Sequence, residues 1–301
     1  MTFSIVAFDP NSGDLGVAVQ SKFMCIGIVT PFAKANVGAI ATQSWINTTY
    51  GPRGLEMLEA GMEVKNVLKK LLSADEMREY RQAAIIDSKG EVDAFTGKNC
   101  FYWAGHIIGE HFSCQGNILI SEETVESMAN AFETQKGDLI DKLLAAMKAG
   151  DEEGRGDVRG KQAAALLVVR EKGGYEGLND RYVDIRVDEH PEPIKELCRI
   201  FELYDLTFLA REDPSNLMTI DGEVSMNIKQ ALIELGYLNK AEITPGDGWE
   251  KVERDALEAW IGINNFESKW RDDGTIWKSI YDYLMNEKGT SFVSLKKMSE
   301  L

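Results

Sequence analysis

The chain has 301 residues, of which 44% are hydrophobic and 27% charged, a composition typical of a folded protein with one large or two modest domains. Asp and Glu number 49 against 33 Lys and Arg, so the formal net charge is −16 at pH 7. Such a surface repels phosphate groups, and we expect neither nucleic acid nor a membrane as a partner. We interpret the acidity itself as a source of solubility.

Four cysteines, Cys25, Cys100, Cys114 and Cys198, are scattered without a Cys-x-x-Cys pair. This spacing argues against a zinc ribbon and against a disulfide framework. The start of the sequence lacks a basic segment followed by an apolar core, and no stretch is apolar enough to cross a bilayer. The expected compartment is therefore the cytoplasm.

The first elements form a predicted β-hairpin. Residues 3–9 and 14–21 are apolar and strand-like, and the turn cluster Pro10-Asn-Ser-Gly13 separates them. A second strand pair is predicted over residues 25–30 and 37–42, and residues 55–72 have the apolar spacing of a helix. The later predicted elements are a hairpin over 82–87 and 91–97, one or two helices over 123–150, strands over 162–169 and 182–187, and a helix over 194–206.

The connections between most neighbouring strands are too short for crossover helices, so the sheets should be largely antiparallel. Two antiparallel sheets with helices outside them, an α+β fold, fit this order better than a doubly wound parallel sheet. The sequence pattern changes near residues 207–215. Residues 213–301 lack clear strands, look mainly helical and hold four of the six Trp. We therefore expect two domains, 1–212 and 213–301.

The hairpin places the start of the chain beside a specific neighbour. If Asp9 and Asp14 flank the four-residue loop and pair with each other, the numbers of any two paired residues add up to 23. Thr2 then lies opposite Ser21. Gln20 and Lys22 would then be adjacent, and a bulge would shift the pairing by one residue.

This register matters because removal of Met1 would leave Thr2 with a free α-amine beside its own hydroxyl. A model α-amine has a pKa of about 7.7–8.0, close enough to neutrality for a general base. Thr activated by its own amine is an established nucleophile, and it needs no histidine. The alternative is that Thr2 is simply the first residue of an edge strand.

Short motifs through residues 2–205 point to a family. They are Thr2-Phe-Ser-Ile-Val-Ala-Phe-Asp9, Gly16-Val-Ala-Val-Gln-Ser21, Gly38-Ala-Ile-Ala-Thr-Gln43, Tyr50-Gly-Pro-Arg-Gly54, Thr96-Gly97, Trp103-Ala-Gly-His106, Gln115-Gly-Asn117, Asp157-Val-Arg-Gly160 and Arg186-Val-Asp188. Together they resemble a bacterial and archaeal family of unknown function assigned to the N-terminal-nucleophile (Ntn) hydrolases. The resemblance implies a four-layer α-β-β-α sandwich and hydrolysis of a C–N amide-type bond.

The resemblance also implies roles for single residues. Thr2 falls at the nucleophile position, and Asp157 matches the Asp that orients the nucleophile region in proteasome-type members. Those members have Ser-Gly where this sequence has Arg159-Gly160, so part of that network is in doubt. The backbone at Gln43-Ser44 would donate to an oxyanion, and Asn47 or Asn117 would add a side-chain donor. Lys22 and Lys34 both compete for the place of a proteasome-like lysine.

Other candidate residues have simpler interpretations. His106 and His111 lack a clear third metal ligand, so we expect packing or hydrogen bonding from them and no metal site. Cys114 lies in an apolar strand, where a thiol is usually inert. The alternating charges between Asp180 and Asp188 favour an ion-paired exposed face over a substrate clamp. Arg159, in a Gly-bounded loop, is a candidate for bidentate binding of a substrate carboxylate.

The C-terminal region resembles the small three-helix peptidoglycan-binding-like domain over about residues 216–285. The resemblance rests on the helix-spaced segment 224–237, which ends Leu-Gly-Tyr237, and on the later Asp273-Gly…Trp277. A cell-wall role conflicts with the lack of an export signal. We therefore expect this region to pack against the catalytic domain or to assemble a dimer, and its aromatic residues to form a core.

The leading hypothesis is an Ntn-type amidohydrolase in which Thr2 attacks an amide carbonyl while Asp157 and Ser21 hold the free amine. We expect a small-molecule amide or peptide as substrate, no cofactor, and a homodimer. The main alternative is a glycan- or peptide-binding protein that keeps the fold without chemistry. A histidine- or thiol-based hydrolase is a third interpretation.

Overall fold

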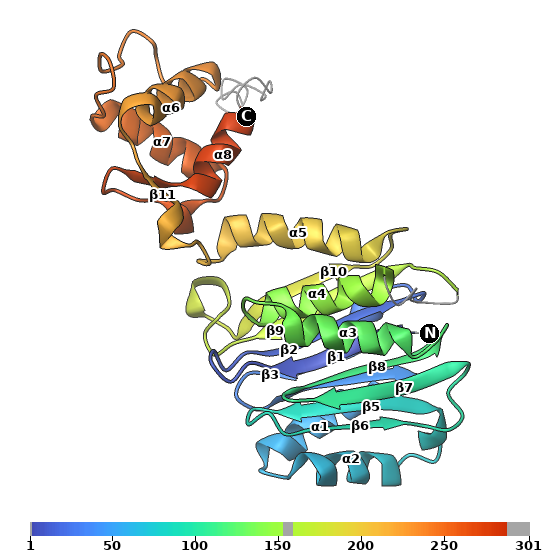
Figure 1. Ribbon diagram of the computed structural model, residues 1–301. Helices are drawn as coiled ribbons and strands as arrows, with labels where there is room; N and C mark the ends of the chain where they lie inside the picture. The colour runs from blue at the N-terminus through green and yellow to red at the C-terminus, as the bar shows by residue number, and fades with distance from the viewer. Residues whose placement is uncertain (1, 153–158, 288–301) are drawn as a thin grey trace, which may run out of the picture. The chain divides into compact units, whose positions relative to one another are not determined.

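A computed structural model of the chain describes residues 2–152 and 159–287 (Figure 1). The chain divides into two compact units, Met1–Ile200 and Phe201–Leu301. The division falls within helix α5 (Pro193–Phe208). Each unit has its own hydrophobic core and is described separately below.

The first unit contains two antiparallel sheets, which confirms the predicted class of fold. The larger has six strands in the order β10-β9-β2-β1-β8-β7, and the smaller has four in the order β3-β4-β5-β6. The strands of the larger sheet are β1 (Thr2–Phe8), β2 (Leu15–Ser21), β7 (Trp103–Gly109), β8 (Phe112–Leu119), β9 (Ala163–Val169) and β10 (Arg181–Val187). The strands of the smaller sheet are β3 (Pro31–Lys34), β4 (Gly38–Ser44), β5 (Arg81–Asp87) and β6 (Val92–Thr96).

The two sheets face each other, and a pair of helices covers the outer face of each (Figure 1). Buried side chains such as Val6 and Val17 from one sheet and Ala39 and Ile86 from the other fill the space between them. Helices α1 (Tyr50–Glu59) and α2 (Val64–Ser73) pack on the smaller sheet. Helices α3 (Glu123–Thr134) and α4 (Leu139–Glu152) pack on the larger one.

The register of the first hairpin is the predicted one. Thr2 pairs with Ser21 and Phe8 with Leu15, without a bulge between them. The backbone N–H of Asp9 donates to the carbonyl of Asp14 and closes the loop. However, β1 is not an edge strand, because β8 pairs with its other side. Thr2 therefore begins a strand in the middle of a sheet.

The prediction of a strand over residues 25–30 is wrong. Cys25 takes a left-handed conformation (φ 57°) and is followed by the 3-10 helix η1 (Ile26–Ile28). Ile26 is buried against Val19 and Ala165, Thr30 is also buried, and Ile28 is exposed, so the run does not have the alternating burial of a strand. The edge strand β3 begins only at Pro31.

Two further differences concern glycine. The helical spacing over residues 55–72 is divided between α1 and α2, because Gly61 adopts a positive φ of 84° that ends the first helix. Strand β7 was not predicted, since Gly105 and Gly109 weaken its strand character. The shorter 3-10 helices of the chain are η2 (Arg78–Tyr80), η3 (Tyr175–Gly177), η4 (Pro214–Asn216) and η5 (Glu267–Lys269).

The second unit is mainly helical, as predicted, with its core around the fully buried Trp260. The expectation that residues 213–301 lack strands is wrong, because the three-residue strands β11 (Leu217–Thr219) and β12 (Thr275–Trp277) pair antiparallel. Strands this short leave no alternating pattern in a sequence. The helices of this unit after α5 are α6 (Gly222–Glu234), α7 (Lys251–Ile263) and α8 (Lys278–Glu287). Among the described helices of the whole chain, none is long and apolar enough to cross a membrane.

A buried ion pair fixes the turn of the first hairpin. The Asp14 side chain is fully buried and accepts hydrogen bonds from Arg170 at 2.7 and 2.6 Å. Arg170 directly follows β9, and its guanidinium lies 3.7 Å from the ring centroid of Tyr182. The pair therefore ties the hairpin that carries Thr2 to the neighbouring strand.

We expect Asp14→Asn to lower the free energy of unfolding by about 3 kcal/mol, because it leaves Arg170 without its buried partner. Urea denaturation at pH 7 measures the loss. The control is Lys34→Gln, which breaks the exposed Lys34–Glu59 pair and should cost less than about 1 kcal/mol. Equal losses in the two variants would contradict the assigned role of Asp14.

Candidate functional site

The strand register brings three predicted site residues together at one end of the larger sheet. Thr2 pairs with Ser21 on one side and with Asn117 on the other. Directly paired residues project from the same face of a sheet, so the three side chains are neighbours. That face is turned to the smaller sheet, because Asn117 Nδ2 donates to Gln82 Oε1 of β5 at 2.9 Å.

The hydroxyls of Thr2 and Ser21 form a hydrogen bond. The distance between Thr2 Oγ1 and Ser21 Oγ is 2.9 Å, and either oxygen can donate. Thr2 is 4% exposed and Ser21 1% exposed, so both lie just beneath the surface. A hydroxyl that accepts from a neighbour is more ready to release its own proton, which is the property a nucleophile needs.

Below this pair, buried glutamines link the two sheets. Gln43 Nε2 donates to Gln82 Oε1 at 2.7 Å and lies 3.5 Å from the backbone carbonyl oxygen of Thr2. Gln43 Oε1 accepts from Ser4 Oγ at 2.7 Å, and Gln115 Nε2 donates to the same hydroxyl at 2.7 Å. All these side chains except Thr2 are fully buried. The network therefore sets the position of β1 against β4 and β5.

The network continues to His106 at the outer strand β7. Gln82 Nε2 donates to Thr96 Oγ1 at 2.9 Å, and Thr96 Oγ1 lies 2.8 Å from His106 Nδ1. Burial lowers the pKa of His106, although Asp93 acts to raise it. His111 lies elsewhere, 3.3 Å from the carbonyl oxygen of Gly90 and edge-on to Phe8. Across residues 2–152 and 159–287, no cluster of three His, Cys, Asp or Glu side chains is arranged to hold a metal.

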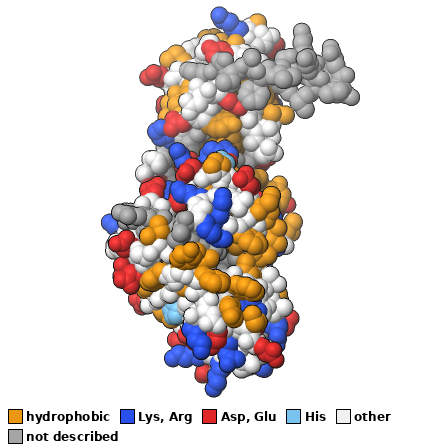
Figure 2. All heavy atoms as spheres, turned by 90° about the vertical axis from the view of Figure 1, so that its right-hand side faces the viewer, with side chains coloured by type: hydrophobic (Ala, Val, Ile, Leu, Met, Phe, Trp, Pro, Cys, Tyr) orange, Lys and Arg blue, Asp and Glu red, His pale blue; other side chains and the backbone are white. Residues whose placement is uncertain are grey.

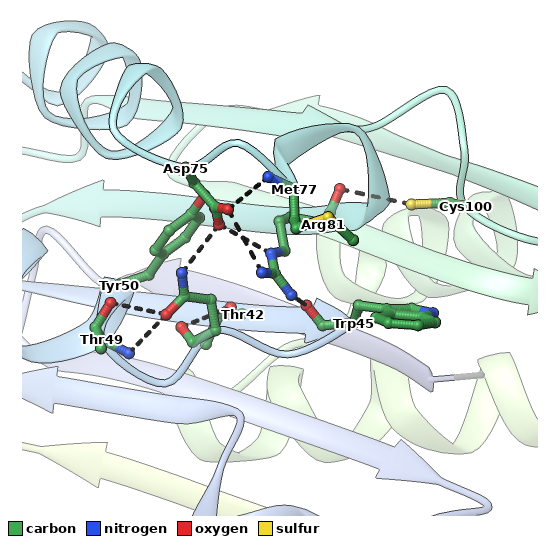
Figure 3. A network of polar contacts seen from close by, with 9 residues as sticks. Thr42, Trp45, Thr49, Tyr50, Asp75, Met77, Arg81 and Cys100 are labelled. Carbon is green, nitrogen blue, oxygen red and sulfur yellow. Dashed lines mark hydrogen bonds and ion pairs between the residues drawn. The ribbon is translucent and has the colours of Figure 1, made fainter.

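A second polar cluster lies beside the end of β4 and centres on Asp75 (Figure 3). Asp75 Oδ2 accepts from Arg81 Nε, Asn47 Nδ2 and the Tyr50 hydroxyl, each at 2.9 Å. Asp75 Oδ1 accepts from the Met77 backbone N–H at 2.8 Å. The side chains of Asp75 and Arg81 are 10% and 14% exposed.

Burial acts to raise the pKa of Asp75, but its hydrogen bonds, led by that from Arg81, outweigh burial and hold the pKa well below its usual range. Burial and the bond to Asp75 raise the pKa of Tyr50 far above its usual range. Asp75 is therefore a fixed anion at neutral pH. Its ligands are structural, and it stabilises the loops on both sides of β4 and β5.

The other predicted site residues have the following positions. Asn47 belongs to the Asp75 cluster, where its Oδ1 accepts from the Thr49 backbone and hydroxyl. Arg159 is exposed, and Asp157 lies outside the described residues. Lys22 directly follows Ser21 and donates to the Lys161 carbonyl at 3.2 Å. Lys34 forms an ion pair with Glu59. It lies opposite Gly38 at the start of β4, five residues before Gln43 at the other end of that strand.

Cys114 and the charged strand β10 are further candidates. Cys114 is fully buried, and burial raises the pKa of its thiol. On the charged strand β10, Arg181 pairs with Asp184 at 2.7 Å.

Sequence reasoning did not identify Gln82, Gln115, Asp75 or Arg81. A partial signal existed for Gln82, which directly precedes the apolar run 83–86 of β5, whereas Gln115 lies in β8 between the polar Ser113 and Asn117 and does not stand out. No comparable signal marks Asp75, which lies between α2 and η2 in a polar stretch.

Comparisons with known proteins assign the chain to a family. Residues 2–197 match the "Family of unknown function (DUF1028)". The chain belongs to this family. Residues 207–284 match the family described as "Putative peptidoglycan binding domain".

Two solved structures are similar to the chain. A DUF1028 protein from Silicibacter pomeroyi is 30% identical, with a TM-score of 0.63, over 69% of this chain and 88% of that one. Anbu, the ancestral β-subunit from Yersinia bercovieri, is 10% identical with a TM-score of 0.34, over 71% of this chain and 98% of that one, a similarity too low to support an argument. No curated protein matches the sequence.

We expect Asp75→Asn to lower the free energy of unfolding by about 3–5 kcal/mol at pH 7, because it removes the charge that Arg81 neutralises. The pKa of Asp75 is lower in the folded state than its unfolded value of about 3.9. The contribution of Asp75 to the free energy of unfolding is therefore complete above its unfolded pKa and is lost as the pH falls through its folded pKa.

Urea denaturation across pH measures this dependence. The difference between wild type and variant should stay constant from about pH 8 to pH 5 and shrink below about pH 4. Glu76→Gln neutralises the exposed neighbouring carboxylate and should change stability by less than about 0.5 kcal/mol. A difference that grows on acidification would contradict the assignment.

Proposed function

We propose that the first unit is an Ntn-type amidohydrolase that uses Thr2 as its nucleophile after removal of Met1. The observation that carries the proposal is the position of the Thr2 hydroxyl at the start of β1, 2.9 Å from that of Ser21. The arrangement of two facing antiparallel sheets, each covered by two helices, supports it as well. That is the layer order expected of an Ntn α-β-β-α sandwich.

The proposed reaction proceeds through an acyl-enzyme. The free α-amine of Thr2 takes the proton of the Thr2 hydroxyl, and Oγ1 attacks the amide carbonyl carbon. The C–N bond then breaks, and the leaving amine carries away the proton that the α-amine received. Water hydrolyses the resulting ester, again with the α-amine as the base, and restores Thr2.

The surrounding residues have distinct roles in this proposal. Ser21 orients the Thr2 hydroxyl, and Gln43 positions the Thr2 backbone through its 3.5 Å contact. Asn117 Oδ1 is buried and has no hydrogen-bond partner among the described residues. Because Asn117 pairs with Thr2, the released α-amine would give this oxygen a donor.

Two further roles rest on the resemblance: Asp157 would also hold the α-amine, and the Gln43-Ser44 backbone would donate to the oxyanion. Arg159, proposed from its place in a Gly-bounded loop, would bind a substrate carboxylate. We assign Asn47 to the Asp75 cluster in place of an oxyanion donor, since its amide already serves Asp75.

We expect Thr2→Ala to abolish amide hydrolysis, because alanine keeps the α-amine but has no hydroxyl to acylate. Thr2→Ser should retain activity within roughly tenfold to a hundredfold of wild type, since serine supplies the same nucleophile. Release of amine from a panel of peptides and small amides measures turnover. Circular dichroism confirms that both variants fold.

For a protein that proves inactive, intact mass distinguishes a retained Met1 from a wrong assignment of the nucleophile. The proposal requires that the purified chain lack Met1, and that an electrophilic inhibitor directed at the nucleophile add a single mass, which fragmentation places at Thr2. Full activity of Thr2→Ala, or of a chain that retains Met1, would refute it.

The second unit supports a second candidate function, binding to peptidoglycan, on the basis of its match over residues 207–284. If this is correct, the full chain should sediment with purified insoluble peptidoglycan, whereas a chain ending at Ile200 should stay in the supernatant. Cellulose, an insoluble polysaccharide without peptide, is the control. Equal sedimentation of both chains would contradict a role for this unit.

A further inference from the structure

Trp45 is an exposed aromatic residue with an unusually well-fixed backbone. Its side chain is 54% exposed, yet its N–H donates to the Tyr80 carbonyl at 3.1 Å and its own carbonyl accepts from Arg81 Nη1 at 2.5 Å. Arg81 is held in turn by Asp75. In Figure 3 the indole points away from this cluster. A largely buried ion pair thus fixes a side chain that itself contributes little to the core.

The chain also turns sharply to present Trp45. Ser44 ends β4 with a φ of 68°, a left-handed conformation that costs a non-glycine residue about 1–3 kcal/mol. The residue before it, Gln43, contacts the Thr2 backbone. The Trp45 side chain therefore leaves the sheet two residues after Gln43, which contacts Thr2. The indole also packs on Tyr80, with the two ring centroids 5.6 Å apart.

Other exposed apolar side chains lie at the same end of the first unit. Phe23 and Met24 follow β2 just after Ser21, whereas Phe101 and Tyr102 precede β7 and Ile120 follows β8. The register places these strand ends beside Thr2 and Asn117. Figure 2 shows the face onto which these strand ends open, and hydrophobic side chains gather on it in a broad patch.

The loops at these strand ends are also free of formal charge. Residues 23–29, 44–49 and 99–103 contain no Asp, Glu, Lys or Arg, and each stretch includes exposed residues. A surface that met water alone would have no reason to exclude charge over these three segments. Their composition fits an uncharged, apolar ligand.

We propose that Trp45, with Phe23, Met24, Phe101 and Tyr102, binds an uncharged apolar or aromatic acyl group of the substrate, beside Thr2. This deepens the proposed function and rests on it. Asp75 and Arg81 are positioning residues that fix the plane of the indole. A second copy of the chain would be a poorer occupant, because it would cover the Thr2 hydroxyl that the proposed reaction needs.

Binding of small amides to the Thr2→Ala chain tests the inference without turnover. Phenylacetamide and acetamide are the probes, titrated with ligand-detected NMR. Phenylacetamide should bind roughly tenfold or more tightly than acetamide, since only it carries a ring to pack on the indole. Trp45→Ala should remove most of this preference, and Trp45→Phe should restore part of it.

The matched control is Tyr175→Ala. Tyr175 is also exposed, but it lies between the end of β9 and the start of β10, at the opposite end of the sheet. It should leave phenylacetamide affinity unchanged. A preference for phenylacetamide that survives Trp45→Ala, or no preference at all, overturns the inference.

The positioning role has its own readout. The indole N–H signal of Trp45, identified by its loss in Trp45→Phe, should be a single sharp line in the parent chain. In Arg81→Lys it should broaden or split, and the preference for phenylacetamide should fall severalfold. An unchanged signal would overturn the role of Arg81.

Two other outcomes are separable. If Trp45→Ala turns a dimer into a monomer in sedimentation experiments and leaves probe affinity unchanged, the patch is an interface between copies and the inference fails. If the wild type hydrolyses no amide while the probe still binds at Trp45, the proposed reaction fails and the apolar site stands.

Discussion

Hydrogen bonds between buried amides hold the two sheets together at the end where β1 begins. Gln43 and Gln82 of the smaller sheet accept hydrogen bonds from Ser4 Oγ and Asn117 Nδ2 of the larger one, and Gln115 completes the network. A buried amide that loses its partner costs about 1–3 kcal/mol, so these contacts tolerate little sliding of one sheet over the other. Farther along the strands, Val6, Val17 and Ala39 pack without such directional contacts. The amides thus decide where the start of the chain lies.

The difference between pairing within one hairpin and contact between two sheets explains what the sequence could predict. The pairing of Thr2 with Ser21 follows from a four-residue turn, which fixes every later pair in the hairpin. The contacts of Gln43 with Gln82 and Gln115 join strands of different sheets, and no spacing rule relates such residues along the chain. The polar Gln82 beside the apolar run of β5 would have suggested that this residue matters, but not which partners it has.

The wrong strand at residues 25–30 has a related cause. An apolar run indicates that some of its residues are buried, but it does not show whether they form a strand. Here Ile26 is buried and Ile28 is exposed, and both belong to a 3-10 helix. Asp75 was missed for the opposite reason, since a carboxylate in a polar stretch usually faces water. Its burial depends on donors from two separate segments, Asn47 and Tyr50 on one and Arg81 on the other, which only the folded chain assembles.

The amide network has a consequence for the chemistry beside it. Ser4, Gln43, Gln82, Gln115 and Asn117 neither gain nor lose protons over the range in which proteins stay folded, so acidification does not disturb the support of Thr2. Many catalytic centres are held in place by carboxylates, and their geometry changes when those carboxylates titrate. Two titratable groups adjoin this scaffold: His106, which contacts Thr96 at the outer strand, and Asp157, which the proposed reaction places at the α-amine. The acid limb of a rate profile measured at Thr2 would thus report the ionisation of the α-amine, Asp157 or His106, and not a change in the amides.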